Sequence, residues 1–333
     1  MADISALASA IFDAIAEPAL IVRAQRTIAA NTAARKLMGE AIIGRDLRFA
    51  IRHPLALDMI LLGGTGEMDV VGIGSADRPW HLSTQPLAGG ASLVRLTDRS
   101  AFQAAERMRT DFVANASHEL RTPLATIIGY AETLAEDGEL ADALRSRFGE
   151  TIRGEARRML RIVEDLMSLS RIEADRFNPP EEIIALQDVA RLAIEHAAPL
   201  SERRCGTIRP DLDPAPARVR GDFGQLLQVA DNLIGNALRY GCTTRSCAIE
   251  VAVRGDGSRA LLEVRDHGDG IAPEHLPRLT ERFYRVDAAR SRDSGGTGLG
   301  LAIVKHIVER HRGTLDIRSS PSKGTEVTVA IPL

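Results

Sequence analysis

Residues 115–127 read NASHELRTPLATI, and the interpretation of the middle of the chain begins with this stretch. Its apolar residues recur every three or four positions, which predicts a helix. At ~100° per residue, His118 lies roughly 160° from Leu120 around the helix axis and faces away from the apolar stripe. Pro123 stands inside the same helix, where its ring clashes with the carbonyl of Glu119 and bends the chain. Such a costly feature in a regular helix tends to mark a functional position.

An exposed histidine beside a carboxylate can act as a nucleophile. Glu119 can hydrogen-bond one ring nitrogen of His118 and make the other nitrogen more nucleophilic. Thr122, one turn further on, can position a water molecule against a modified His118. The helix alone leaves a second interpretation open, which is a solvated surface histidine with no chemical role.

The helical pattern extends over residues 100–174, which contain few Gly or Pro. Two helices of about 30 residues are expected on either side of EDGEL at 136–140, each with one apolar stripe that it cannot bury alone. We therefore expect a homodimeric four-helix bundle, and the alternative is a monomeric hairpin that leans on the next domain. The two stripes comprise Met108, Phe112, Ala116, Leu120, Leu124, Ile127, Ala131 and Leu134, then Leu144, Phe148, Ile152, Met159, Ile162, Leu166 and Leu169.

The segments on either side of the hairpin have a different character. Residues 1–98 mix short strands and helices with Gly and Pro in the turns, which predicts a small α+β sensor-type domain. RFNPPEE at 176–182 predicts a linker. Residues 183–333 alternate helices and strands and predict an α/β sandwich, with one sheet and helices on one face. The expected domains are therefore 1–98, 99–175 and 183–333.

Composition limits the classes of function. The chain has 333 residues and a formal net charge of −3, which gives no indication of binding to nucleic acid or anionic lipid. The three cysteines, at 205, 242 and 247, include no C-x-x-C pair, which fits a reducing compartment and argues against structural zinc. With no run of ~18 apolar residues and no signal peptide, we expect a cytoplasmic chain without a membrane segment. A longer parent with an N-terminal anchor stays open.

Three clusters in the last part of the chain indicate a nucleotide site. In DNLIGNALRY, Asn232 and Asn236 share one helix face, and their amide oxygens suit Mg²⁺ that is shared with phosphates and water. Arg239 could meet phosphate, and Tyr240 could pack on a base. The alternative is the polar face of an ordinary helix, although Asn is a poor residue for a helix interior.

The second and third clusters are rich in glycine. In EVRDHGDGI, Asp266 ends a strand and can accept a hydrogen bond from an exocyclic amine, while Gly268 and Gly270 let the backbone approach a base. In GGTGLGLAIVKHIVERH at 295–311, glycines stand directly before an apolar helix, so that backbone N–H groups at the start of the helix can form an anion site. It is not a P-loop, because no G-K-[ST] follows. The polar, Arg-rich run at 281–294 predicts a mobile lid over the phosphates.

In this order the motifs resemble those of the sensor histidine kinases of two-component systems, across residues 100–333. SHELRTPL resembles the H-box of the dimerisation and histidine-phosphotransfer domain, NLIGNALRY the N-box, DHGDG the G1 box, ERFYR the F-box and GGTGLGL the G2 box. KGTEV is similar to the last glycine motif. The chain departs from the pattern at His267, where the family often has Asn, at Thr280, where the F-box often starts with Phe, and at Arg239, which replaces the usual Lys.

The resemblance implies a role for each matched residue. His118 would accept the phosphoryl group, Glu119 would be its general base, and Thr122 would orient water for phosphatase action on the partner. Asn236 would hold Mg²⁺, with Asn232 close by. The remaining residues implied to bind ATP are Arg239 at the phosphates, Tyr240 and Asp266 at the adenine, and Gly268, Gly270, Gly296, Thr297, Gly298, Leu299, Gly300 and Thr325 around them.

The implied function is autophosphorylation of His118 from Mg–ATP in a homodimer, followed by transfer to an aspartate of a response regulator protein, with phosphatase activity on that regulator. An ATPase of the gyrase and chaperone type shares the N- and G-boxes but lacks the histidine hairpin. A degenerate signalling scaffold would not need His118 and Asn236 intact. Residues 1–98 resemble a PAS domain more loosely, through ANTAARKLMG and LVRLTDRS. The whole chain is similar to the cytoplasmic part of a phosphate-regulon-type sensor kinase.

Overall fold

The computed structural model describes residues 2–75, 77–136, 140–175, 178–204, 206–242, 247–287 and 296–333. The chain forms two compact units, Met1–Val113 and Ala114–Leu333. The second unit contains most of the histidine hairpin together with the α/β region, because the second hairpin helix packs directly on a helix of the α/β region. The division into three domains stays a prediction.

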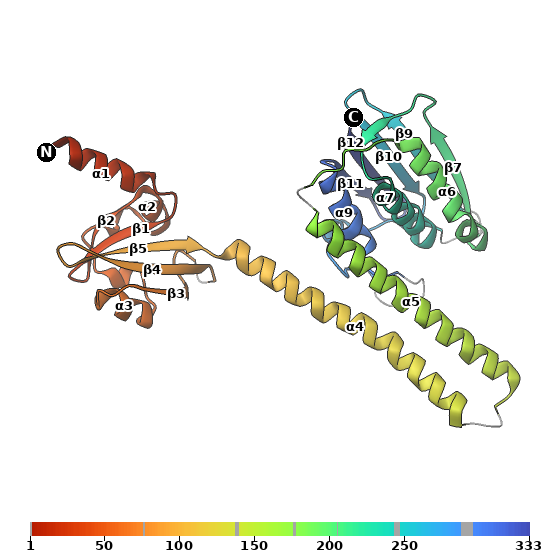
Figure 1. The fold of residues 1–333 in the computed structure, drawn as a ribbon, viewed down its shortest axis with the longest axis horizontal. Coiled ribbons are helices and arrows are strands. Elements are labelled where there is room, and N and C mark those ends of the chain that lie inside the picture. Colours follow the sequence, from red (N-terminus) through yellow and green to blue (C-terminus); the bar gives the residue numbers. More distant parts are fainter. Residues whose placement is uncertain are drawn as a thin grey trace. The chain divides into compact units, whose positions relative to one another are not determined.

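The first unit is built around a five-stranded antiparallel sheet with the strand order β2-β1-β5-β4-β3 (Figure 1). Aliphatic side chains from the sheet and its helices form the core, together with Trp80, whose Nε1 donates to the carbonyl of Ile73 over 2.9 Å. The mixture of short strands and helices that the sequence predicts over residues 1–98 is found. The elements are α1 (Ala2–Ala14), β1 (Ala19–Arg23), β2 (Arg26–Ala30), α2 (Thr32–Met38), η1 (Glu40–Ile42), η2 (Leu47–Phe49), α3 (Pro54–Leu61), β3 (Gly66–Val71), β4 (Pro79–Leu87) and β5 (Ala91–Asp98).

Two long helices, α4 (Ser100–Glu136) and α5 (Asp142–Ala174), form the expected hairpin. α4 continues through Pro123, and Pro123 is buried. Part of the predicted apolar pattern is covered within the chain, as at Ile162 and Leu169, which are fully buried. Other apolar side chains of the hairpin stay exposed, and they include Leu124, Ile128, Leu160, Val163 and Met167. Within the part of the chain that is described, no helix has the length and apolarity needed to cross a membrane.

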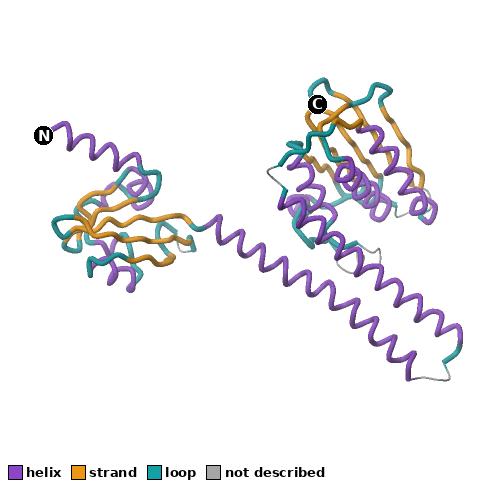
Figure 2. The backbone as a smooth tube through the Cα atoms, in the orientation of Figure 1, coloured by secondary structure: helices purple, strands orange, loops and turns teal. Residues whose placement is uncertain are grey.

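The α/β region is a five-stranded sheet, ordered β11-β12-β10-β9-β7, with a separate two-stranded sheet of β6 and β8. Only β7 and β9 pair in parallel within the described sheet. Helices α6, α7 and α9 cover the sheet on one face, as expected, and α5 packs on α9 (Figure 2). The elements are β6 (Ile183–Ala185), α6 (Leu186–Arg203), β7 (Gly206–Leu212), β8 (Arg218–Arg220), α7 (Phe223–Asn236), η3 (Ala237–Gly241), β9 (Cys247–Gly255), β10 (Arg259–Asp266), η4 (Pro273–Arg278), α9 (Gly300–Arg310), β11 (Thr314–Ser319) and β12 (Thr325–Pro332).

The helix that carries the two asparagines differs from the expectation at its end. Asp222 caps α7, since its side chain accepts from the backbone N–H of Gln225 over 3.0 Å. α7 ends at Asn236, and the chain then widens into the π-helical turn η3 rather than continuing as one α-helix to Tyr240. Such π-turns are frequent at functional sites, where they redirect side chains.

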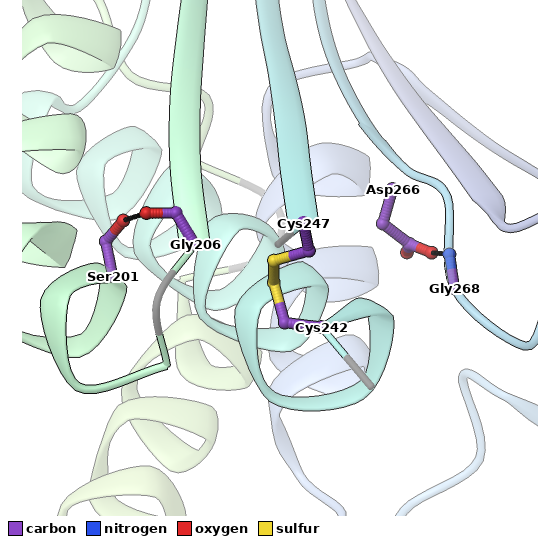
Figure 3. Close-up of a disulfide and its surroundings, with 6 residues drawn as sticks. All are labelled: Ser201, Gly206, Cys242, Cys247, Asp266 and Gly268. Atoms are coloured by element: carbon purple, nitrogen blue, oxygen red, sulfur yellow. Dashed lines mark hydrogen bonds between the residues drawn. A yellow bond between two sulfur atoms is a disulfide. The ribbon is translucent and has the colours of Figure 1, made fainter. Parts of the chain in front are cut away.

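Two of the three cysteines are paired, which the sequence analysis did not predict. Cys242, directly after η3, and Cys247, the first residue of β9, form a disulfide (Figure 3). Their Cα atoms are 5.3 Å apart, a separation that disulfides commonly span. The pairing depends on the fold bringing the end of η3 beside the start of β9, which a search for C-x-x-C spacing does not detect. Cys205 lies outside the described residues.

Candidate active site

A cavity of about 380 Å³ opens between α7, the start of α9 and the ends of β10 and β12. Residues from all the predicted nucleotide motifs meet in its wall. Those that line it are Asn232, Asn236, Arg239, Tyr240, Asp266, Gly270, Gly296, Thr297, Gly298, Gly300 and Thr325. A mixed apolar and polar cavity of this size matches a small-molecule site.

The asparagine helix and the glycine-led helix touch at this cavity. A Cβ atom added to Gly300 would lie 2.7 Å from Asn232 Oδ1, so only glycine permits this approach. Asn236 Oδ1 accepts a hydrogen bond from Arg239 Nη1 over 3.4 Å. Burial lowers the pKa of the Arg239 guanidinium from its usual value, although it stays cationic at neutral pH. The two asparagines and a desolvated cation therefore line the same cavity.

Asp266 forms the other end of the cavity and is buried. Its Oδ1 accepts from the backbone N–H of Gly268 over 2.9 Å and of Thr325 over 3.2 Å. Burial raises the pKa of the carboxyl group, and the two N–H donors oppose that rise. These bonds fix the carboxylate at the strand end, where it can accept a hydrogen bond from a ligand amine.

Gly268 and Leu299, two of the predicted ligand residues, do not line the cavity but support it. A Cβ atom on Gly268 would lie 2.6 Å from the Cα of Gly241, so the Asp266 turn and the end of η3 are packed backbone to backbone. Leu299 is fully buried, and its N–H donates to Thr297 Oγ1 over 3.3 Å. Of the predicted lid at 281–294, residues 288–294 lie outside the described residues.

The hairpin helix α5 also contributes to the cavity wall, which the sequence analysis did not predict. Arg161 and Asp165 line the cavity, and Thr297 Oγ1 donates to Asp165 Oδ2 over 2.7 Å. Burial raises the pKa of the Asp165 carboxyl group, against the lowering effect of the Thr297 bond. The signal that could have found Asp165 is its position, three residues after Ile162 on the apolar side of the helix.

His118 lies on α4 and is exposed, as its helical position predicts. The neighbouring Glu119 is bound by two arginines: its Oε2 accepts from Arg158 Nη2 over 3.1 Å and from Arg285 Nη2 over 2.9 Å. Both guanidinium groups are at least nine-tenths buried. Thr122 Oγ1 donates to the carbonyl of His118 over 3.3 Å, a common bond within a helix.

Arg285, which the sequence analysis did not assign to the site, connects the two regions. Its side chain lines the nucleotide cavity, and the same side chain bonds Glu119 beside His118. Its Nε is buried without a hydrogen-bond partner among the described residues. A buried donor of this kind is costly, and the adjoining cavity offers the space for an anionic acceptor.

The donor set fits a magnesium ion that is shared with a nucleotide. Asn232 and Asn236 line the cavity and carry amide oxygens of the kind that bind Mg²⁺, which commonly takes few protein ligands beside phosphate and water oxygens. Among the described residues, no group of three or more His, Cys, Asp or Glu could hold a metal by itself. The site therefore favours a shared ion over an all-protein metal site.

Two family models match the chain over the regions that carry this site. The His Kinase A (phospho-acceptor) domain matches residues 108–175, which contain His118. The histidine kinase-, DNA gyrase B-, and HSP90-like ATPase model matches residues 221–333, which contain most of the cavity wall. An ATPase-like nucleotide module joined to a phospho-acceptor hairpin defines the class.

Curated relatives refine this class. The chain is 41% identical over 237 residues to the phosphate regulon sensor protein PhoR of Pseudomonas aeruginosa, a match that covers 71% of the chain and 53% of that protein. It is 36% identical over 241 residues to the sensor-like histidine kinase SenX3 of Mycobacterium tuberculosis, covering 72% and 58%. The chain belongs to the sensor histidine kinases. It spans about half the length of these relatives.

Solved structures agree on the fold. The histidine kinase AdeS of Acinetobacter baumannii superposes with a TM-score of 0.51 at 24% identity, over 65% of this chain and 97% of that one. The histidine kinase ThkA, solved in complex with the response regulator protein TrrA, gives a TM-score of 0.51 at 16% identity and covers 97% of both chains. At these identities the likeness concerns the fold alone.

Proposed function

We propose that this protein is a histidine kinase that phosphorylates His118 with ATP and passes the phosphoryl group to an aspartate of a response regulator. The observation that carries the proposal is Arg285, which lines the nucleotide cavity and bonds the carboxylate next to His118. One side chain thus connects the candidate phosphoryl donor site with the candidate acceptor.

In the proposed reaction, an imidazole nitrogen of His118 attacks the γ-phosphorus of ATP. The new N–P bond forms as the bond to the bridging oxygen breaks, and ADP leaves. Glu119 receives the imidazole proton when it is not fully paired with Arg158 and Arg285. Positioning and charge neutralisation supply most of the rate in such transfers.

The nucleotide would lie with its adenine at Asp266 and Tyr240 and its phosphates toward Arg239 and the start of α9. Asn236 would hold Mg²⁺, with Asn232 close by, and the ion would neutralise charge on the phosphates. The backbone N–H groups at the start of α9 add an anion site at the same place. Thr297, Gly298 and Gly300 shape this turn.

The test uses the whole chain with ATP labelled in its γ-phosphate. The wild type should acquire acid-labile, base-stable label, and His118→Gln should acquire none while it binds ATP with unchanged affinity. The exposed His196 on α6, changed to Gln, is the matched control and should leave labelling intact. Labelling that persists in His118→Gln would overturn the assignment.

We also propose that the active form is a homodimer that joins two hairpins. The exposed side chains of Leu124, Ile128, Leu160 and Val163 support this, because a lone hairpin would leave this apolar surface in water. Sedimentation should give twice the chain mass. Replacing Leu124 and Ile128 together with Asp should yield monomers, and a monomeric wild type would contradict the proposal.

Two finer assignments belong to the same proposal. The first unit is a PAS-like sensor domain, which its antiparallel sheet with short flanking helices supports. Thr122 serves phosphatase action on the regulator, since it lies one turn from His118 on the same exposed side. Thr122→Ala should retain autophosphorylation and lose dephosphorylation of the regulator, which a paired assay on one protein preparation can separate.

A further inference from the structure

The Cys242–Cys247 disulfide is joined to the nucleotide cavity through the turn η3. η3 carries Arg239 and Tyr240, both of which line the cavity, and Cys242 is the residue directly after η3. The bond ties this end of η3 to the first residue of β9 (Figure 3). The chain that follows Tyr240 is thus tied covalently to the sheet.

The same segment is packed against the Asp266 turn. A Cβ atom on Gly241 would lie 2.4 Å from the Asp266 Cβ, and one on Gly268 would lie 2.6 Å from the Gly241 Cα. Gly241 therefore has no room to shift toward Asp266. The disulfide restrains the residue that follows Gly241, so these contacts and the bond hold η3 together.

The two sulfur atoms differ in access. Cys242 is buried, with 7% of its surface exposed, whereas Cys247 is partly exposed. Thiol–disulfide exchange needs access to one sulfur of the pair, and Cys247 is the more exposed of the two residues. Cys242 then serves as the leaving group on reduction and as the second attacking thiolate on oxidation.

We propose that Cys242 and Cys247 form a redox modification site that reacts with small disulfides and dithiols and sets the affinity of the nucleotide cavity. The proposal rests on the proposed function of that cavity. The oxidised pair holds Tyr240 and Arg239 in place against the Asp266 turn. When the pair is reduced, this end of η3 is free to move. A nucleotide that binds must then order the segment, and this cost lowers the affinity for the nucleotide.

The chemistry balances with a small disulfide such as oxidised glutathione. The Cys247 thiol loses its proton, and its thiolate attacks one sulfur of the reagent, which releases one glutathione thiolate and leaves a mixed disulfide. The Cys242 thiol then loses its proton and attacks the Cys247 sulfur, which forms the protein disulfide and releases the second thiolate. Two protein thiols are oxidised, and one small disulfide is reduced to two thiols.

The experiment uses the whole chain with Cys205→Ser, so that Cys242 and Cys247 are the remaining cysteines. One sample is oxidised with oxidised glutathione and the other is reduced with dithiothreitol, and both are freed of reagent without air. Intact mass reports the loss of two hydrogens on oxidation, and calorimetry measures the affinity for ATP. We expect the oxidised sample to bind ATP about tenfold more tightly, a gain of the size that ordering a binding segment in advance gives.

The control is Cys242→Ser with Cys247→Ser in the same background. It should bind ATP like the reduced sample and give no response to glutathione. Equal affinity in the oxidised and reduced samples, or failure of the pair to oxidise, would overturn this inference and leave the proposed function standing. Absence of ATP binding in both samples would overturn the proposed function and the inference with it.

Discussion

Arg285 donates a hydrogen bond to Glu119 over 2.9 Å although 166 residues separate them in the chain. Arg158 donates to the same carboxylate oxygen over 3.1 Å. Both guanidinium groups therefore hold the same oxygen of the carboxylate beside the exposed His118. If Glu119 takes the proton of His118, as proposed, we expect at least one of the two arginines to leave it during the reaction.

The first prediction concerns this carboxylate. Glu119→Gln should lower the rate of His118 phosphorylation by roughly 10²–10⁴-fold, the usual contribution of a general base. ATP affinity should not change, since Glu119 does not line the cavity. Single-turnover labelling and calorimetry measure the two quantities separately. Glu155→Gln is the control, because Glu155 lies near the same Arg158, at 3.8 Å, but stands on α5 and is not the neighbour of His118 in the chain.

An unchanged labelling rate in Glu119→Gln would remove Glu119 from the reaction. A loss of folding would be visible as a lower Tm in both the Gln variants, since each takes a negative charge from the same buried arginine. The comparison with Glu155→Gln therefore distinguishes a role in proton transfer from the loss of an ion pair.

A second prediction follows from burial of Asp165 on α5. Burial, the largest cause, raises the pKa of this carboxyl group above its usual 3.8. Above the raised pKa the group is ionised in the folded and unfolded states, and the folded state bears the cost of a buried charge. As pH falls, the folded state takes up the proton first, and below 3.8 both states are protonated and the cost is gone.

Asp165→Asn should therefore raise the Tm at neutral pH by a few degrees, given roughly 2–4 °C per kcal/mol for a chain of this size. Its amide oxygen still accepts the Thr297 hydroxyl. The gain over the wild type should shrink as the pH approaches 3.8 from above. Thermal melts from pH 7 to pH 4 test this, with the exposed neighbour Glu164→Gln as the control. A gain that does not depend on pH would contradict the burial argument.

A third prediction concerns the specificity of the cavity. Asp266→Ala should weaken ATP binding by roughly 10–100-fold, the usual effect of losing a hydrogen bond to a charged group. Affinity for GTP should change little, because guanine carries a carbonyl oxygen where adenine carries its exocyclic amine. Competition binding with both nucleotides measures the ratio. Glu263→Gln on the same strand is the control, and an equal loss for ATP and GTP would show that Asp266 only supports the fold.

The sequence predicts the site where one element carries a whole motif. Asn232 and Asn236 share a helix face by spacing alone, and the glycines before α9 mark its N-terminus. Arg285 and Asp165 could not be predicted in this way. Their roles depend on how α5 packs on α9 and on how the chain after Phe283 reaches α4. The position of Asp165 on the apolar side of α5 marks it as unusual, but no local signal shows which residues either side chain meets.

The same limit applies to the end of α7 and to the cysteines. The apolar spacing of residues 223–240 favours one continuous helix, but Gly241 must lie flush against Asp266, and η3 widens the helix to reach that position. The disulfide then depends on this tertiary arrangement. Contacts between distant segments determine where α7 ends and which cysteines pair. The helix propensity of either segment does not determine them.

The last prediction concerns Pro123, which is buried within a continuous α4. Proline has no N–H, so the carbonyl of Glu119 lacks its usual partner four residues on, and the helix is weakened next to His118. Pro123→Ala restores that donor and should stiffen α4, so that the part above His118 moves less freely relative to the part below. We expect the ratio of kinase to phosphatase activity to change severalfold while ATP affinity stays the same. Gly129→Ala is the matched control: it strengthens α4 by about 1 kcal/mol, and its added Cβ would meet no atom within 4 Å. If both variants shift the ratio equally, general helix stability is the cause, and Pro123 has no role as a bend point.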